Sequence, residues 1–218
     1  MIPSSIGNIE NLQLLSIFSN YLTGLIPSSI GNLKLLSYIY AFNNSLTGSI
    51  PSSLENLISL TRIELSNNSL TGTIPSLLKD QKKLQSLEFL NNYLTGSILS
   101  DFVNLDTLEF FIFSHNYLTG SIPSNVGNLT SLRYLFFSDN YLTGSIPLSV
   151  GDLKELTFFY LSNNYFTGSI PSMINKLTLL DSNRFGGSLT DIFNPLIQLN
   201  LNTIQLNDNQ FTGVTFFN

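Results

Sequence analysis

Apolar residues recur along the chain at a fixed step of about 24 residues, which is the spacing of a repeat architecture. One series begins at Leu12 and returns at every step as far as Leu156, and two more apolar positions follow each leucine, as Ile63 and Leu65 follow Leu60. Apolar residues two positions apart, separated by variable ones, predict a short strand buried on one face. One such unit cannot bury its apolar face alone, so we expect stacked coils around a common core, each adding a parallel strand about 4.8 Å from its neighbour.

Polar and turn-forming residues keep the same step. Asparagine forms one column: Asn20, Asn44, Asn68, Asn92, Asn116, Asn140, Asn164 and Asn209. An amide both donates and accepts, so this column is predicted to satisfy backbone groups at a buried bend. Seven of the 14 glycines, from Gly24 to Gly168, and seven of the 8 prolines, from Pro3 to Pro171, follow in step. Glycine and proline at these positions predict a reversal of the chain after each strand.

The turn segments resemble the plant-type leucine-rich repeat. An example is Leu142-Thr143-Gly144-Ser145-Ile146-Pro147, followed by Val150-Gly151-Asp152-Leu153. The resemblance covers nearly the whole chain in about nine copies. It implies an α/β-type solenoid, mainly β with 3₁₀ segments: a right-handed superhelix with a concave parallel β-sheet, a second short strand after each turn, and 3₁₀ segments on the convex side. Residues 1–218 are therefore expected to form a single solenoid domain.

Residues 170–213 depart from the regular step. The unit containing Leu177 to Asn183 lacks about five residues of the strand segment, and the next unit, from Gly187 to Gly213, is two residues longer than the regular ones. We expect an irregular or pinched coil here, which leaves the strand pairing of its neighbours open. An error in the gene model is the alternative explanation.

Composition excludes several classes of protein. The chain has 218 residues, no cysteine and a net charge of -5, with 43% hydrophobic and 12% aromatic residues. The acidic balance argues against a nucleic-acid partner. The lack of cysteine excludes a disulfide scaffold, a thiolate zinc site and a cysteine nucleophile. The hydrophobic content argues against disorder. No cofactor and no metal site are expected.

The two ends suggest a fragment. Met1-Ile2-Pro3 enters the repeat in mid-unit, and neither a signal peptide nor a membrane-spanning run is found. Neither end offers a recognisable cap, and the apolar stretch before Asn218 would leave a strand edge open. In the resembled family, caps usually carry paired cysteines. Zero cysteine therefore indicates an internal piece of a longer ectodomain, located outside the cell or at its surface.

Aromatic and apolar residues gather at the variable strand positions of repeats five to seven. These positions are expected on the concave face: Phe110, Ile112, Tyr134, Phe136, Phe158 and Tyr160. A tyrosine column is expected where the strands end: Tyr93, Tyr117, Tyr141 and Tyr165. Contiguous exposed aromatic surface usually marks an interaction site. Alternatively, aromatic side chains simply suit strand surfaces and stack along the ladder. A smaller cluster comprises Leu14, Phe18, Tyr38, Tyr40 and Phe42.

A polar window separates the two aromatic groups. It contains Arg62, Ser86 and two glutamates, Glu64 and Glu88, which occupy equivalent positions on adjacent strands. Their carboxylates repel each other, and a cationic group of a ligand would relieve the repulsion. The alternative is a solvated face on which Arg62 is the local counter-charge.

The single histidine raises an enzymatic hypothesis. His115 is predicted to lie beside Asp139 on the next strand, with Ser114 and Ser138 adjacent. A catalytic triad needs a serine within hydrogen-bond reach of the imidazole, and a site that excludes water. These residues are expected on an open ledge, so we predict a non-enzymatic protein in which His115 makes a pH-sensitive contact at the ligand-binding face.

Three sequons permit N-glycosylation if the chain is secreted, at Asn43, Asn67 and Asn128. Asn128 is expected on the convex segment and is the preferred site. Glycans at Asn43 or Asn67 would shade the concave face beside the smaller aromatic cluster.

Three functions follow from the resemblance and the surface. The first is a binding module of a receptor-like protein or receptor-like kinase, with a peptide or protein ligand or a co-receptor as partner. The second is a secreted inhibitor of a glycoside hydrolase, similar to polygalacturonase inhibitors. The third is ice binding through a threonine column that runs from Thr23 to Thr167.

Overall fold

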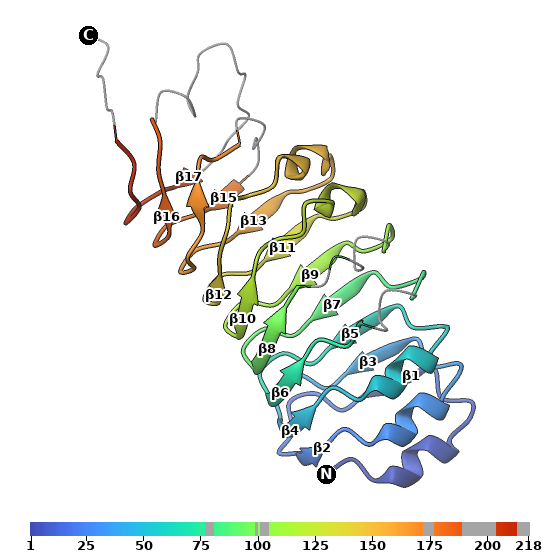
Figure 1. Cartoon of the computed structure of the whole chain (residues 1–218). Coiled ribbons are helices and arrows are strands. Elements are labelled where there is room, and N and C mark those ends of the chain that lie inside the picture. Colours follow the sequence, from blue (N-terminus) through green and yellow to red (C-terminus); the bar gives the residue numbers. More distant parts are fainter. Residues whose placement is uncertain (77–80, 99, 101–104, 172–176, 189–203, 213–218) are drawn as a thin grey trace.

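The described residues form an elongated stack of coils, with the first coil at one end of the row and the coil of β17 near the other (Figure 1). The computed structural model describes residues 1–76, 81–98, 100, 105–171, 177–188 and 204–212. Its strands are parallel and its described helices are 3₁₀ turns. The expected solenoid of parallel strands is confirmed.

One nine-stranded parallel sheet runs the length of the stack. Residues one repeat apart lie opposite each other, as Ile39 does to Ile63. The central residue of a strand is buried, as at Ile39, Ile63 and Leu135, which is the period-2 pattern expected from the sequence. In spatial order the strands are β1 (Leu14–Ser16), β3 (Tyr38–Tyr40), β5 (Arg62–Glu64), β7 (Ser86–Glu88), β9 (Phe110–Ile112), β11 (Tyr134–Phe136), β13 (Phe158–Tyr160), β15 (Leu177–Leu179) and β17 (Ile204–Gln205).

A second parallel sheet confirms the strand expected after each turn. Gly48 pairs here with Leu70 and not with the equivalent Gly72, so each strand is offset by two residues from the repeat step. The strands of this sheet are β2 (Thr23–Leu25), β4 (Ser45–Ser49), β6 (Ser69–Thr73), β8 (Tyr93–Ser97), β10 (Tyr117–Gly120) and β12 (Tyr141–Leu142). A separate pair, β14 (Thr167–Gly168) and β16 (Arg184–Phe185), follows.

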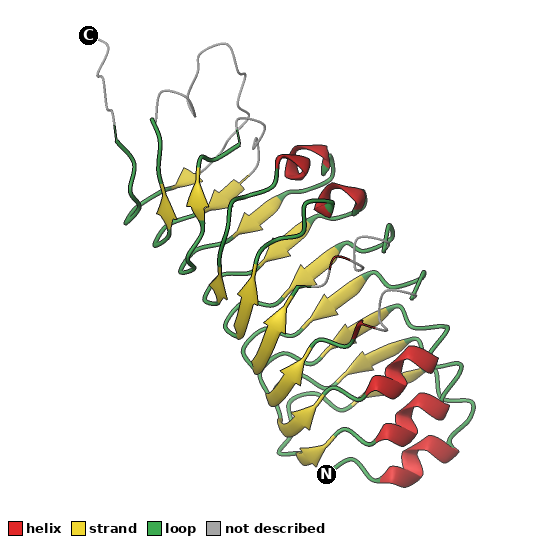
Figure 2. Cartoon of the chain, in the orientation of Figure 1, coloured by secondary structure: helices red, strands yellow, loops and turns green. Residues whose placement is uncertain are grey.

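Short 3₁₀ helices line another side of the stack (Figure 2). They are η1 (Ser4–Asn8), η2 (Ser28–Asn32), η3 (Ser52–Asn56), η6 (Val126–Asn128) and η7 (Leu148–Asp152). Every one of them except η6 begins directly after a proline. Gly31 in η2 approaches the next coil so closely that an added β-carbon would overlap the carbonyl oxygen of Ser53.

Asparagine side chains join successive coils beneath the bend that follows each strand of the nine-stranded sheet. Asn116 is typical: its Nδ2 donates to the carbonyl oxygen of Phe89 in the preceding coil (2.9 Å), and its Oδ1 accepts from the backbone N–H of Leu94 (3.0 Å). The side chain is buried, and it also bonds carbonyl groups of its own coil. The predicted asparagine ladder is confirmed. It also includes Asn183, which the regular step does not reach.

The nine-stranded sheet continues through the irregular segment. Tyr134 pairs with Phe158, which follows it in the chain by a full repeat. Phe158 pairs in turn with Leu177, although Leu177 follows it by five residues fewer than a full repeat. Asn183 takes its place in the ladder equally early. The deficit therefore lies between Pro171 and Leu177 and not in the strand. Residues 172–176 of this stretch lie outside the described residues, as do residues 213–218. So does Leu201, which the sequence predicts as the last member of the leucine series that begins at Leu12.

Candidate binding surfaces

Five aromatic side chains form one continuous layer on the nine-stranded sheet. This aromatic patch comprises Phe110, Tyr134, Phe136, Phe158 and Tyr160. Tyr134 stacks on Phe110 with ring centres 4.6 Å apart and on Phe158 at 5.2 Å. Phe136 stacks on Tyr160 at 4.4 Å, and Tyr134 meets Phe136 edge to face. The rings are half-buried, and stacked neighbours cover one another's faces.

Ile112 does not belong to the exposed surface. It was expected on the concave face beside the aromatic residues, but only 9% of it is exposed. It lies opposite Phe136 of β11 and Glu88 of β7. The neighbouring side chains are large enough to cover a residue of this size. The expectation that Ile112 is exposed is therefore wrong.

A smaller aromatic cluster lies at the other end of the same sheet. Phe18 stacks on Phe42 with ring centres 4.5 Å apart, and Tyr38 lies 6.2 Å from Tyr40. Leu14 is 49% exposed next to Tyr38. The sheet thus carries apolar surface at coils one and two and again at coils five to seven.

The polar window between them has an unbalanced charge. Glu64 and Glu88 lie directly opposite each other on β5 and β7. Ser86 Oγ donates a 2.7 Å hydrogen bond to Glu88 Oε1, and this serine is fully buried rather than open to the window. Arg62 turns away: its guanidinium carbon lies 5.7 Å from the centre of the Phe110 ring. In the described part of the chain it makes no ion pair with either carboxylate.

The electrostatic consequence appears at Glu64. Burial raises the pKa of its carboxyl group, and the charge of Glu88 raises it further, whereas Arg62 lowers it. The pKa of the neighbouring Tyr40 is also raised, first by burial and then by Glu64. The window therefore holds negative charge that the protein itself compensates only in part.

His115 belongs to a row of equivalent residues, one in each coil, that share the left-handed backbone conformation. His115 has φ 55°, and the equivalent residue of each neighbouring coil has φ between 52° and 56°. Only asparagine, aspartate, serine and histidine occupy these described positions, and the first two of these tolerate positive φ best. In chain order the row is Ser19, Asn43, Asn67, Asn91, His115, Asp139, Asn163, Ser182 and Asp208. The row was not predicted from the sequence because its residue types vary.

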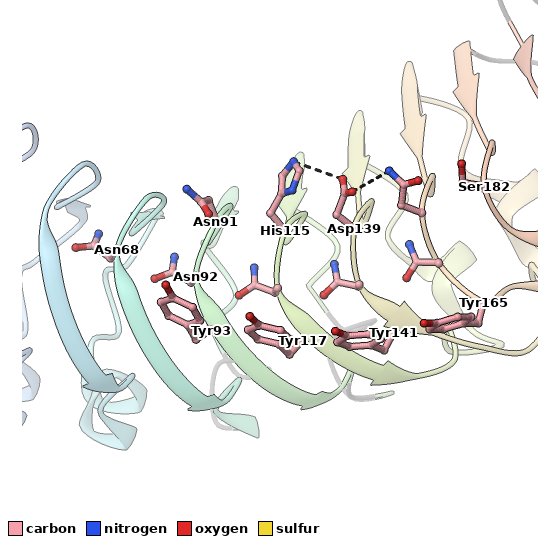
Figure 3. A pocket seen from close by; sticks show the side chains of 14 residues that line it. Asn68, Asn91, Asn92, Tyr93, His115, Tyr117, Asp139, Tyr141, Tyr165 and Ser182 are labelled. Carbon is pink, nitrogen blue, oxygen red and sulfur yellow. Dashed lines mark hydrogen bonds and ion pairs between the residues drawn. The ribbon is translucent and has the colours of Figure 1, made fainter.

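His115 and Asp139 form the predicted contact. Their Nε2 and Oδ2 atoms lie 3.4 Å apart, and Asn163 donates a 2.8 Å hydrogen bond to the other oxygen of Asp139 (Figure 3). The hydrogen bonds of the described residues include none between the imidazole and Ser114 or Ser138. Ser114 is itself buried. Among the described residues, neither serine is thus hydrogen-bonded to the imidazole as a triad serine would be.

A polar groove of about 630 Å³ runs beside this row. One wall is the tyrosine column, Tyr93, Tyr117, Tyr141 and Tyr165, in which successive ring centres lie 6.0, 5.9 and 6.1 Å apart. The other wall includes Asn91, His115, Asp139, Asn163 and Ser182, and ladder asparagines form the floor (Figure 3). The guanidinium carbon of Arg184 lies 4.7 Å from the centre of the Tyr165 ring, at the end of the tyrosine column. The tyrosines and His115 were predicted from the sequence, whereas Asn91, Asn163, Ser182 and Arg184 were not.

The threonine column lies on the second sheet. Its members are exposed, and several bond alike to the preceding coil: Thr119 Oγ1 donates to Gly96 and Thr143 Oγ1 to Gly120, at 3.4 and 3.2 Å. Because this sheet is staggered, Thr95 lies opposite Thr73 and Tyr117, not opposite Thr71 and Thr119. Equivalent threonines therefore form an oblique row.

The sequon asparagines differ in their contacts. Asn128 is exposed at the end of η6, and its side chain makes no hydrogen bond among those of the described residues. Asn43 Nδ2 donates to Ser19 Oγ (3.3 Å), and Asn67 Nδ2 donates to Asn43 Oδ1 (2.8 Å). Of the three, Asn128 alone is thus both exposed and unengaged within the described part of the chain.

Stacked parallel strands with a buried asparagine ladder define a solenoid built from leucine-rich repeats. The chain belongs to the leucine-rich repeat family, because the family model described as Leucine Rich Repeat matches residues 11–33, 35–57, 59–80, 107–129, 131–153 and 155–177. Comparison with curated proteins gave no match. No helix in the described residues is long and apolar enough to cross a membrane.

Solved structures of plant receptor ectodomains share this fold. The ectodomain of the receptor kinase GASSHO1/SCHENGEN3 from Arabidopsis thaliana, solved with CASPARIAN STRIP INTEGRITY FACTOR 2, has 36% identity and a TM-score of 0.90 over 97% of this chain. The Arabidopsis receptor kinase HAESA, solved with the peptide hormone IDA and the co-receptor SERK1, has 31% identity and a TM-score of 0.90, also over 97% of this chain. The chain spans 26% and 36% of those two proteins.

A plant ice-binding protein is also similar. It has 31% identity and a TM-score of 0.82, and the match covers 97% of this chain and 69% of that one.

Proposed function

We propose that this chain is a non-catalytic peptide- or protein-binding module, part of the extracellular ectodomain of a receptor-like protein at the cell surface. The observation that carries the proposal is the aromatic patch, a continuous half-buried layer of five rings on a regular sheet. Large, rigid aromatic side chains dominate binding hot spots, because they bury much area at little entropic cost. The similar receptor kinase HAESA, solved with a peptide hormone, supports the same assignment.

The alternative role of the rings is purely structural. Stacking along a ladder stabilises a solenoid even where nothing binds. The rings of the patch nevertheless differ from the core phenylalanines: Phe111 and Phe137 are buried inside the stack, whereas the patch residues cover the outer face of the same strands. A packing role alone would not require a second aromatic layer on the solvent side.

A peptide-display selection tests the proposal. Linear peptides selected on the folded chain should lose about tenfold or more in affinity when Tyr134, Phe136 and Phe158 are changed to serine together. The matched control changes Tyr21, Ile58 and Leu148 to serine, which removes three exposed apolar side chains outside the nine-stranded sheet and the groove. Thermal unfolding of both variants verifies that they are folded. Unchanged affinity in the patch variant would contradict binding through this sheet.

Ice binding is the second candidate function. The row of exposed threonines and the similarity to a plant ice-binding protein favour it. Replacing Thr95, Thr119 and Thr143 with lysine should abolish thermal hysteresis and inhibition of ice recrystallisation in the purified protein. If the unmodified protein shows neither property, this candidate function is excluded.

A further inference from the structure

We infer that the nine-stranded sheet takes an extended peptide with one basic residue between two apolar anchors, the basic side chain lying over Glu64 and Glu88. The inference rests on the proposed peptide-binding function and specifies the chemistry of the ligand. Three kinds of surface follow one another along the sheet: an apolar cluster at β1 and β3, the acidic window at β5 and β7, and the aromatic patch from β9 to β13.

The distance between neighbouring strands sets how many residues separate the ligand side chains that reach the three surfaces. The strands lie across the long axis of the stack, so a ligand that follows this axis crosses them one after another (Figure 1). Each step between strands is about 4.8 Å, and an extended peptide rises about 3.3 Å per residue. From the middle of the Glu64–Glu88 pair to the middle of the patch, at Tyr134, is two and a half steps, or about four residues. To Tyr38 on the other side is one and a half steps, or about two residues.

Charge complementarity selects the central residue. Two carboxylates face each other, and the adjacent Arg62 is engaged with Phe110 instead of with them. One oxygen of Glu88 is held by Ser86 Oγ, which fixes the orientation of that carboxylate. An arginine or lysine of the ligand would remove the repulsion between the glutamates and gain charge-assisted hydrogen bonds to both.

The apolar flanks favour a peptide over a simple cation. A polyamine or a metal ion would satisfy the carboxylates but would leave both aromatic surfaces uncovered. A peptide brings a basic group and two bulky apolar groups at distances fixed by its backbone. Leu14 and Tyr38 are exposed on one side, 49% and 37%, and the half-buried stacked rings of the patch lie on the other.

Synthetic peptides test the inference. The probe carries tryptophan two positions from a central arginine and phenylalanine four positions beyond it on the other side, with serine between; the same spacing in reverse order tests direction. The better of the two should bind the unmodified chain about tenfold or more tightly than its citrulline analogue, which keeps the shape of arginine and loses the charge. In the double variant Glu64→Gln/Glu88→Gln, this difference should vanish. In Glu55→Gln, a carboxylate on η3 and not on the sheet, it should persist.

The outcomes separate this inference from the proposed function. Three outcomes would overturn the inference. The first is equal affinity for the arginine and citrulline peptides, the second is a difference in affinity that survives in the double variant, and the third is no binding by either orientation of the peptide. Library-selected peptides whose binding depends on the aromatic patch but not on a basic residue would leave the proposed function intact. Calorimetry provides the affinities, and thermal unfolding verifies that the double variant is folded.

Discussion

Arg62 reaches over the buried Ser86 and places its guanidinium carbon 5.7 Å from the centre of the Phe110 ring, two strands away. A larger residue at position 86 would block this path. Because the arginine lies over an aromatic ring instead of pairing with a carboxylate, it offsets the repulsion between the facing carboxylates of Glu64 and Glu88 only in part. The acidic window therefore keeps excess negative charge, while the arginine contacts the first residue of the aromatic patch.

Replacing one of the two carboxylates should stabilise the fold at neutral pH. The pKa of Glu64 lies above its ordinary 4.5, so the folded chain holds this proton more tightly than the unfolded chain. The stabilisation from protonated Glu64 is present below the ordinary value and is lost as the pH rises through the raised pKa. We expect Glu64→Gln to raise the Tm at neutral pH, because it removes the repelled charge. The rise should be only on the order of 1–2 °C, because the carboxyl group is partly exposed and solvent screens its charge. Below pH 4.5 the gain should disappear.

Scanning calorimetry at the two pH values measures this difference. Glu55→Gln, on the exposed side of η3, should leave the Tm unchanged at both. A gain for Glu64→Gln that is the same at both pH values would show that charge is not its cause.

Removing one ladder asparagine should destabilise the chain strongly. Asn116→Ala leaves the backbone N–H of Leu94 unsatisfied and removes one of two amide donors from the carbonyl oxygen of Phe89, which keeps its bond from Asn92 Nδ2 (3.2 Å). A buried group left unsatisfied costs about 1–3 kcal/mol, so a loss of about 2–3 kcal/mol is expected. Urea denaturation provides the free energy of unfolding. The control Asn128→Ala, at an exposed asparagine, should stay within about 0.5 kcal/mol of the unmodified protein.

The backbone at His115 predicts which substitutions are tolerated. With φ at 55°, His115→Asn should change the free energy of unfolding little, whereas His115→Val should cost about 1–2 kcal/mol, because a β-branched residue is strained there. Both variants remove the contact with Asp139. If the two variants lose stability by the same amount, the contact with Asp139, and not the backbone angle, explains why a histidine occupies this position.

Secretion in a eukaryotic host should add a glycan first at Asn128. Its exposed side chain has none of the contacts that hold Asn43 and Asn67 in their row. Asn128→Gln should then remove most of the mobility shift caused by glycosidase treatment. A full shift retained in Asn128→Gln would assign the glycan to one of the other two sequons.

The fold was predictable from the sequence because its main determinants are periodic. The burial of residues such as Ile63 and Leu65 and the asparagine ladder follow from positions that return at a fixed step, and the second sheet was implied by the resemblance of the turn segments to a known repeat. Prediction failed where position alone does not decide the outcome. Ile112 has the spacing of an exposed residue but is buried, because its neighbours are large.

The asparagine ladder and the groove were predicted only in part. Asn183 was missed because it follows Asn164 five residues sooner than the regular step requires. The left-handed row was missed because its common property is a backbone angle, shared by residues as different as His115 and Ser182. Arg184 aligns with the tyrosines only after the short unit is recognised, so its contact with Tyr165 depends on three-dimensional structure.

The continuous sheet across the short unit has an evolutionary consequence. Phe158 and Leu177 pair in the same way as Tyr134 and Phe158, which are five residues farther apart in the chain. Strand pairing in this sheet therefore tolerates a change in the number of residues between strands. A deletion between a proline and the next strand can therefore be inherited without displacing any strand from its neighbour. Repeats of this kind can vary in length on one side while the surface presented by the sheet stays in register, which gives a lineage freedom to remodel one face of the molecule independently of the other.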